Sequence, residues 1–169
     1  NKIPLKDKKI TAEVCIHHLW FTNDDYATKG NFIKWNPAVK TENDRKVLWE
    51  ALLDDRIDVI ATDHAPHTLE EKQQSYLKAP SGGPLVQHAV IAMFEAFHQG
   101  KITITKKKKK MAHNPAIIFK IEKRGFIKEG YFADLVIVNP SLPWSVKPEN
   151  ILYKCGWSPF ENFTFKSRI

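Results

Sequence analysis

A carboxylate and two histidines directly follow an apolar run near the middle of the chain. The run Ile57–Thr62 is short and rich in β-branched residues, and it leads into Asp63-His64-Ala65-Pro66-His67. Such a run predicts a strand buried on both faces of a parallel sheet. Parallel α/β folds place reactive groups at the carboxyl ends of their strands, where an aspartate can bind a metal ion or accept a proton. The alternative is a capping aspartate beside histidines that the core satisfies.

A second strand and a helix are predicted before this motif. The run Ile10–Ile16 is β-rich and mostly apolar, so it also fits a buried strand. Thr41 is a suitable N-cap for a helix over 42–55, in which apolar residues recur at helical spacing.

The segments after the motif continue this alternation. A polar loop is predicted over 68–83, and a second helix over 84–99 begins with proline and ends at Gly100. The order strand, helix, strand, helix, with apolar strands, favours a parallel sheet covered by helices. Two strands are too few to close a barrel.

The character of the chain changes after Asn114-Pro115, where short strands joined by glycine turns are expected, including one over 133–138. We therefore predict two units, residues 1–120 and an incomplete β-rich unit over 121–169. The chain begins at Asn1 without a methionine and ends on residues that read as a strand cut short. These ends indicate a piece of a longer protein.

Five consecutive lysines, Lys106–Lys110, interrupt a stretch that should be helical. In a helix, Met111 shares a face with positions 107 and 108, so a core-facing helix would bury Lys107 or Lys108. The alternatives are a solvated loop with snorkelling lysines, or a run that departs from the natural sequence. The run supplies five of the seven net positive charges, and no basic stripe alternates with aromatics elsewhere, so nucleic-acid binding is not predicted.

Neither a membrane span nor a disulfide framework is expected. No stretch approaches the roughly 20 apolar residues that a membrane span needs. Cys15 and Cys155 are far apart in the sequence and form no metal-binding pair. The cytoplasm is therefore the expected location.

Seven segments of the chain form one pattern. The strongest is ATDHAPHT at 61–68. EVCIHHL at 13–19 and WNPAVK at 35–40 precede it, with Ile16 in place of a usual proline and substitutions at 38–40. The other four are at 111–116, 130–135, 154–157 and 158–161. In order and spacing, these segments resemble the dihydroorotases of the amidohydrolase superfamily.

The resemblance implies a role for each matching residue. Asp63 corresponds to the eighth-strand aspartate, which binds zinc and takes the proton of the attacking hydroxide. His17 and His18 are expected to have supporting or packing roles, because the histidine ligands of the family belong to earlier strands.

Substrate binding is also implied. His67 corresponds to the residue that holds the substrate carboxylate. The groups that correspond to ring-binding positions are Asn36 and the backbone of Pro80, Ser81, Gly82 and Gly83.

The implied fold is the C-terminal part of a (β/α)8 TIM-type barrel, with strands seven and eight and their helices, plus part of a small β-sandwich. The implied activity is the reversible, zinc-dependent hydrolysis of the cyclic amide of dihydroorotate to N-carbamoyl-aspartate in de novo pyrimidine biosynthesis. One or two zinc ions are expected. Because their other ligands would lie before Asn1, the chain alone is expected to be inactive.

Two other interpretations stay open. A hydantoinase, dihydropyrimidinase or allantoinase shares the barrel and the aspartate but as a rule lacks the second histidine of DHAPH, so His67 favours a dihydroorotase. The protein can also be a non-catalytic homologue that is the structural partner of another pyrimidine enzyme. The resemblance further implies a small-molecule substrate, and either a homodimer or association with another enzyme of the pathway.

Overall fold

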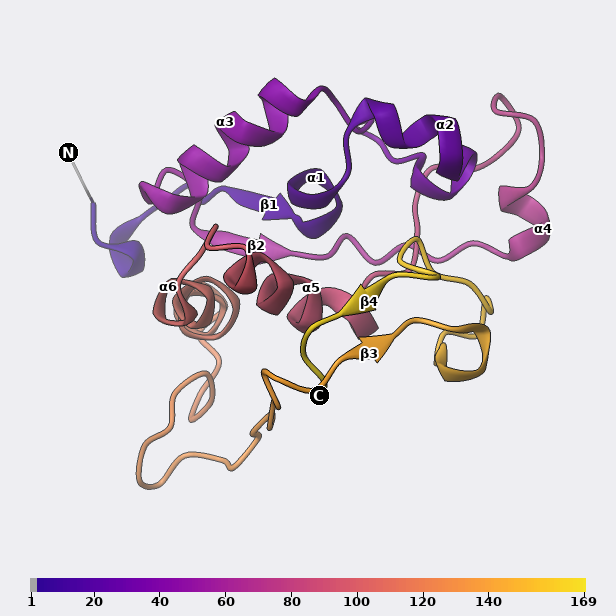
Figure 1. The fold of residues 1–169 in the computed structure, drawn as a ribbon. Helices are drawn as coiled ribbons and strands as arrows, with labels where there is room; N and C mark the ends of the chain where they lie inside the picture. The colour runs from indigo at the N-terminus through magenta and orange to yellow at the C-terminus, as the bar shows by residue number, and fades with distance from the viewer. Residues whose placement is uncertain (1–2) are drawn as a thin grey trace.

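Short helices and strands joined by long connections make up residues 3–169, the part of the chain that the computed structural model describes (Figure 1). Their bounds, in chain order, are η1 Leu5–Asp7, β1 Glu13–Cys15, α1 Ile16–Trp20, η2 Asn23–Asp25, α2 Tyr26–Lys29, η3 Gly30–Ile33, α3 Glu42–Leu53, β2 Val59–Ala61, α4 Leu69–Lys72, α5 Val86–His98, α6 Ile104–Lys108, η4 Lys109–His113, α7 Asn114–Ile118, β3 Trp144–Ser145, η5 Pro148–Asn150 and β4 Thr164–Phe165.

Strands β1 and β2 form a parallel pair with Val14 opposite Ile60. Val14, Val59 and Ile60 are buried, as expected for β-branched side chains on a covered sheet. The predicted parallel arrangement is confirmed. Both strands are shorter than predicted. Strand β1 is short because Ile10 is exposed before it and Ile16 already begins α1, and β2 covers only Val59–Ala61 of the predicted 57–62.

The two longest helices form close to their predicted positions, but α3 ends at Leu53 rather than 55, and α5 begins at Val86, so the proline expected to begin it lies outside the helix. The side chain of Thr41 accepts a hydrogen bond from the backbone N–H of Asp44 at the start of α3. Helix α5 is followed by Gly100, whose φ of 72° suits a residue without a Cβ. In Figure 1, α3 lies above the two strands, and α5 and α6 lie below them. No helix within residues 3–169 is long and apolar enough to cross a membrane.

Aromatic side chains join the end of the chain to this core. Trp20 on α1 packs edge-on against Phe160 and Phe163, with ring centroids 5.1 Å and 5.0 Å away. Phe160 and Phe165 are almost completely buried. Burying each of these rings contributes about 1.5–3 kcal/mol. The segment that contains β3 and β4 is therefore held on the helices by apolar burial.

Strand structure over 121–169 is sparser than predicted. Strands β3 and β4 pair antiparallel over two residues each. The strand expected over 133–138 is wrong, since the structure assigns no strand there and Leu135, Val136 and Ile137 are exposed. A β-branched run forms a ladder only beside a partner strand, and no part of residues 3–169 pairs with it.

The lysine run is helical. Helix α6 continues into the π-helical turn η4 and then into α7. Lys107 is buried, as predicted for a core-facing helix, with its ammonium 3.6 Å from the centroid of the Phe94 ring. Lys110 is buried as well, and the solvated loop is therefore wrong.

Candidate active site

Asp63 lies just beyond the carboxyl end of β2. Its backbone has a φ of 46°, a left-handed conformation that aspartate tolerates better than most residues. The residue is exposed, and residues 3–169 provide no hydrogen-bond partner for its side chain. The carboxylate is therefore available to a ligand or to a proton.

The end of β1 brings two histidines and a thiol to the same edge of the sheet. His17 is fully buried and stacks on Trp35, with centroids 4.3 Å apart and planes 7° apart. Within the described residues, neither ring nitrogen has a hydrogen-bond partner. Burial, with a smaller contribution from His18, lowers the pKa of His17 to about 3, so its ring is neutral. Burial, with the nearby Asp63 carboxylate, raises the pKa of Cys15 to about 12, so this thiol stays protonated.

Asn36 is exposed on the connection between η3 and α3. Its neighbour Pro37 has its carbonyl oxygen 3.0 Å from His18 Nε2. Its other neighbour, Trp35, packs so closely on Gly83 that a Cβ at that glycine would lie 2.9 Å from the indole. This connection therefore runs between the end of β1 and the predicted substrate loop, Pro80–Gly83.

His67 lies against that loop. Its Nε2 donates to the Ser81 carbonyl oxygen at 3.0 Å, and its Nδ1 is 3.7 Å from a Glu71 carboxylate oxygen. Its backbone carbonyl accepts a hydrogen bond from the Trp157 indole at 2.8 Å. Gly82 approaches the motif so closely that a Cβ there would lie 2.6 Å from the Ala65 carbonyl oxygen. The structure thus brings His67 and the substrate loop together, while no hydrogen bond or ion pair within residues 3–169 joins Asp63 to either.

Two lysines at this loop were not among the predicted site residues. The side chain of Lys72 is buried beneath the loop, and its Nζ donates to the carbonyl oxygens of Pro80 and Gly82. Lys34 Nζ donates to the carbonyl oxygens of Tyr76 and Ala79, at 2.6 Å each. Lysine in a polar stretch gives no local sign of burial, so no sequence signal distinguished them from solvated residues.

A comparison with protein-family models shows which family this chain belongs to. The model of the amidohydrolase family matches residues 5–166. The chain belongs to the amidohydrolase family. The dihydroorotase of Halobacterium salinarum is 40% identical over 151 residues, which are 89% of this chain and 36% of that relative. The dihydroorotase of Pyrococcus horikoshii is 39% identical over 160 residues, 95% of this chain and 36% of the relative. The chain therefore spans about a third of the length of these curated relatives.

Solved structures agree with the family and with the mixed α/β fold. The L-hydantoinase (dihydropyrimidinase) of Arthrobacter aurescens superposes with a TM-score of 0.86 at 25% identity, covering 93% of this chain and 36% of that one. An inactive dihydroorotase-like domain of a Chaetomium thermophilum CAD-like multifunctional protein superposes with a TM-score of 0.61 at 22% identity, covering 96% of this chain and 41% of that one.

The metal-binding capacity of this amidohydrolase chain is small. Asp63 offers a free carboxylate, but no group of three or more His, Cys, Asp or Glu side chains in residues 3–169 is arranged to hold a metal ion. A catalytic zinc usually has three protein ligands. The described residues therefore do not form a zinc site by themselves.

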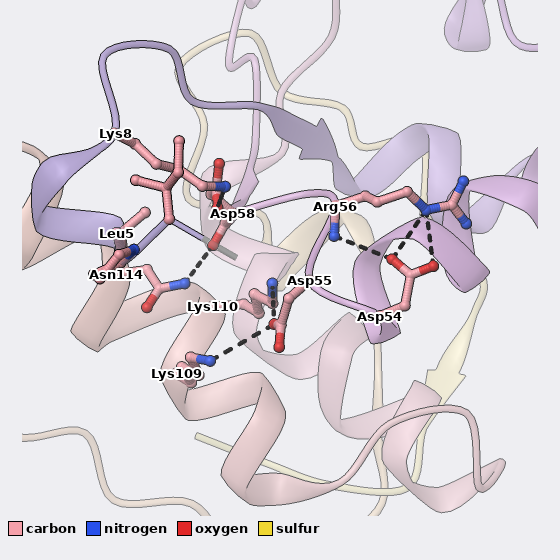
Figure 2. A pocket seen from close by; sticks show the side chains of 11 residues that line it. Leu5, Lys8, Asp54, Asp55, Arg56, Asp58, Lys109, Lys110 and Asn114 are labelled. Atoms are coloured by element: carbon pink, nitrogen blue, oxygen red, sulfur yellow. Dashed lines mark hydrogen bonds and ion pairs between the residues drawn. The ribbon is translucent and has the colours of Figure 1, made fainter. Parts of the chain in front are cut away.

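The amino end of the strands differs from the site. A cavity of about 540 Å³ opens there, lined by charged side chains that pair with one another (Figure 2). Asp58, just before β2, is buried and accepts hydrogen bonds from Lys8 Nζ at 2.5 Å and from the Ala12 backbone N–H at 3.1 Å. Asp55 Oδ1 lies 2.8 Å from Lys110 Nζ and 3.1 Å from Lys106 Nζ.

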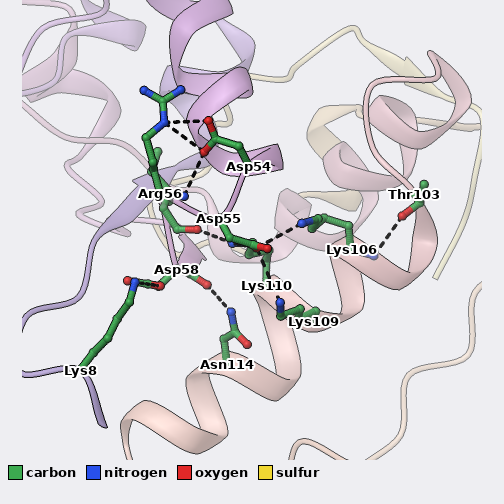
Figure 3. A network of polar contacts seen from close by, with 11 residues as sticks. Lys8, Asp54, Asp55, Arg56, Asp58, Thr103, Lys106, Lys109, Lys110 and Asn114 are labelled. Atoms are coloured by element: carbon green, nitrogen blue, oxygen red, sulfur yellow. Dashed lines mark hydrogen bonds and ion pairs between the residues drawn. The ribbon is translucent and has the colours of Figure 1, made fainter. Parts of the chain in front are cut away.

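Figure 3 shows how this network joins separate elements. Asp54 and Arg56, in the connection from α3 to β2, form an ion pair at 2.8 Å. The amide of Asn114 donates to the Asp58 carbonyl oxygen at 2.6 Å. The network ties the α3–β2 connection to helices α6, η4 and α7. In α/β barrels this end of the strands contributes stability rather than chemistry.

Proposed function

We propose that the full-length protein, meaning the complete natural polypeptide that contains these residues, is a dihydroorotase. It would interconvert dihydroorotate and N-carbamoyl-aspartate in de novo pyrimidine synthesis in the cytoplasm. Residues 1–120 would supply strands seven and eight of a (β/α)8 barrel, and residues 121–169 part of a β-sandwich. The observation that carries the proposal is His67 held against the Pro80–Gly83 loop, in a chain 40% identical to a dihydroorotase.

In the hydrolytic direction, Asp63 is the proposed base. A ring amide is a poor electrophile and water a poor nucleophile, so a group that removes a proton from the attacking water lowers the barrier. Asp63 would accept that proton and pass it to the departing ring nitrogen. Its exposed carboxylate, without a hydrogen-bond partner in residues 3–169, supports this role.

His67 would bind the substrate carboxylate, and Asn36 with the backbone of the loop would bind the pyrimidine ring. Both ring nitrogens of His67 already face protein groups, Ser81 and Glu71. The substrate carboxylate would therefore replace the Ser81 carbonyl at Nε2. An imidazole that binds a carboxylate forms a charge-assisted hydrogen bond, stronger than the one it gives up.

Zinc is the proposed cofactor of the full-length protein, with Asp63 as a ligand. Carboxylate oxygen suits zinc, but Asp63 is only one of the ligands such a site needs. The others must come from outside residues 3–169. This requirement is why the 169-residue chain by itself is proposed to be inactive.

Two alternatives have specific support. The TM-score of 0.86 with an L-hydantoinase favours a cyclic amidohydrolase for a ring without a carboxylate, such as a hydantoinase, dihydropyrimidinase or allantoinase. The similarity to an inactive dihydroorotase-like domain favours a non-catalytic partner of another pyrimidine enzyme. A homodimer, or association with such an enzyme, is part of the proposal in either case.

The decisive experiment assays the purified, zinc-loaded full-length protein with dihydroorotate, dihydrouracil, hydantoin and allantoin. We expect kcat/KM for dihydroorotate to exceed that for each of the other rings by at least about 100-fold, since His67 would recognise a carboxylate that they lack. Faster hydrolysis of hydantoin or dihydrouracil contradicts the proposal. Absence of turnover with all four rings, in a folded protein, supports the non-catalytic alternative.

A further inference from the structure

Lys72 carries a buried positive charge that faces carbonyl oxygens only. The residue ends α4 and is 1% exposed. Its Nζ donates to Gly82 O at 2.8 Å, to Pro80 O at 2.9 Å and, more weakly, to Lys34 O at 3.4 Å. These contacts use all three protons of the ammonium. No carboxylate in residues 3–169 lies within ion-pair distance of it.

Burying an ammonium group costs free energy, so the contacts of Lys72 must offset a cost that a solvated lysine does not have. Burial, with a smaller contribution from the charge of Lys34, lowers the pKa of Lys72 to about 8, so the ammonium form predominates near neutral pH. Its partners are backbone atoms of one loop and of the segment behind it. The lysine therefore constrains backbone positions rather than neutralising an acid.

Each backbone carbonyl of the substrate loop, from Pro80 to Gly83, accepts a hydrogen bond from another part of the protein. Lys72 binds the first and third, those of Pro80 and Gly82. His67 binds the second, that of Ser81, and the Ala65 backbone N–H donates to the fourth, that of Gly83. The Gly82 N–H donates in turn to Lys34 O, an oxygen that Lys72 also contacts. The loop is thus joined to the motif and to the segment after η3.

The direction of Lys72 is itself fixed. Thr68 and Glu71 form reciprocal hydrogen bonds at the start of α4, from Thr68 N to Glu71 Oε2 at 2.8 Å and from Glu71 N to Thr68 Oγ1 at 3.2 Å. The Asn31 amide donates to the backbone carbonyl of Lys72 at 3.2 Å. The ammonium also lies 5.7 Å from the centroid of the Trp157 ring. A residue anchored in this way gives the loop a fixed reference point.

We propose that Lys72 is a positioning residue that fixes the Pro80–Gly83 backbone in the conformation that binds the ring substrate. This inference rests on the proposed function, in which that backbone contacts the ring. When substrate takes the Nε2 of His67, the Ser81 carbonyl loses its partner. Lys72 then holds the loop from the two carbonyls on either side.

The test uses Lys72→Met in the zinc-loaded full-length protein, because methionine keeps much of the volume and removes every donor. We expect KM for dihydroorotate to rise about 10- to 100-fold and kcat to stay within about 3-fold, since uniform binding is lost and Asp63 is untouched. The matched control is Lys78→Met, an exposed lysine of the same loop region. Its KM should equal that of the wild type.

Three kinetic outcomes overturn the proposal. The first is an unchanged KM with a lower melting temperature or a smaller active fraction, which is the behaviour of a purely structural lysine. The second is a large loss of kcat at constant KM. The third is an equal rise of KM in Lys78→Met. If Lys72→Met does not accumulate as folded protein, Lys72→Leu, which also lacks a donor, replaces it, and a wild-type KM in that variant overturns the proposal as well.

Hydrogen–deuterium exchange separates this inference from the proposed function, because it needs no turnover. Without substrate, the backbone amides of residues 81–83 should exchange faster in Lys72→Met than in Lys78→Met. Equal exchange overturns the positioning role, whatever ring the enzyme prefers. If the wild type hydrolyses hydantoin and not dihydroorotate, the proposed function fails, and the KM comparison is made with hydantoin.

Discussion

Two aspartates flank strand β2 and have opposite surroundings. Asp58, at the amino end, is buried and accepts hydrogen bonds from Lys8 and from the Ala12 backbone. Asp63, at the carboxyl end, is exposed and has no hydrogen-bond partner in residues 3–169. One strand thus separates a carboxylate that the fold uses from one that the fold leaves available.

The same contrast extends to the neighbours of each aspartate. At the amino end, the buried ammonium of Lys110 is paired with Asp55. At the carboxyl end, the ring nitrogens of His17 and the indole N–H of Trp35 are buried and lack partners within residues 3–169. A buried polar group without a partner costs about 1–3 kcal/mol. The two ends thus differ in how far the described residues satisfy their own polar groups: those at the amino end pair with one another, and several at the carboxyl end have no partner within residues 3–169.

The sharpest way to break this contrast is Asp63→Asn in the full-length protein. We expect turnover of dihydroorotate to fall by roughly 10²- to 10⁴-fold, because the amide cannot accept the proton of the attacking water. The fold should be unaffected, since asparagine is as suitable as aspartate at cap and turn positions. The measurements are kcat, zinc content and thermal unfolding. A folded variant that holds its zinc and keeps more than about a tenth of the activity would show that Asp63 is structural, like Asp58.

The next effect concerns recognition at the carboxyl end. His67→Ala should lower kcat/KM for dihydroorotate. The loss should correspond to about 2–4 kcal/mol of transition-state stabilisation, the value of a charge-assisted hydrogen bond to a buried carboxylate. Zinc content should equal that of the wild type. Any residual activity on hydantoin, which has no carboxylate, serves as the internal control and should change little. Loss of zinc would mean that His67 belongs to the metal site and was assigned wrongly to the substrate.

At the amino end, Asp58→Ala should affect stability and not chemistry. The substitution removes a buried carboxylate that accepts hydrogen bonds from the Lys8 ammonium and the Ala12 backbone N–H, so the free energy of unfolding should fall by about 1–3 kcal/mol. The kcat/KM per folded molecule should be unchanged. Asp54→Ala is the matched control: the half-exposed side chain of Asp54 pairs with Arg56, and its loss should cost less than about 1 kcal/mol. A drop in kcat/KM for Asp58→Ala would abolish the distinction between the two ends.

The smallest effect tests a histidine of the core. His88 is fully buried, with Nδ1 3.1 Å from the Ser158 hydroxyl, and burial lowers its pKa to about 4. An unfolded chain binds this proton below about pH 6.5, whereas the folded protein does not bind it until about pH 4. The stability due to neutral His88 is therefore present above pH 6.5 and is lost as the pH falls toward 4.

Urea unfolding at pH 7 and pH 5 measures this loss. The wild type should lose about 1–2 kcal/mol more than His88→Gln between these values, since glutamine does not titrate. Equal losses in the two proteins would mean that His88 keeps an ordinary pKa.

The sequence patterns predicted elements that depend on local residues. The β-branched run before Asp63, the capping Thr41 and the stop at Gly100 specify their elements through neighbouring residues, and the structure has all three. The strand expected over 133–138 failed because a ladder depends on a partner elsewhere in the chain. Local patterning is therefore sufficient for helices and for buried strands, and insufficient for exposed ones.

The residues of the candidate site also differ in how directly the sequence indicates them. Asp63 and His67 belong to one continuous motif, so the sequence indicated them directly. Lys72 follows the motif within a polar stretch, and its burial arises only when the loop over 80–83 folds back over it. The residue types around a lysine do not indicate that three carbonyl oxygens will converge on its ammonium.

The hydrogen bond from the Trp157 indole to the His67 carbonyl has a consequence for how the polypeptide can be divided. A protease cut in the exposed stretch over 133–138 would produce two pieces. These pieces would still meet at this bond and at the buried rings of Phe160 and Phe165. Split-protein complementation at that stretch would then preserve the motif, whereas deletion of the C-terminal piece would remove the donor that holds His67 in place.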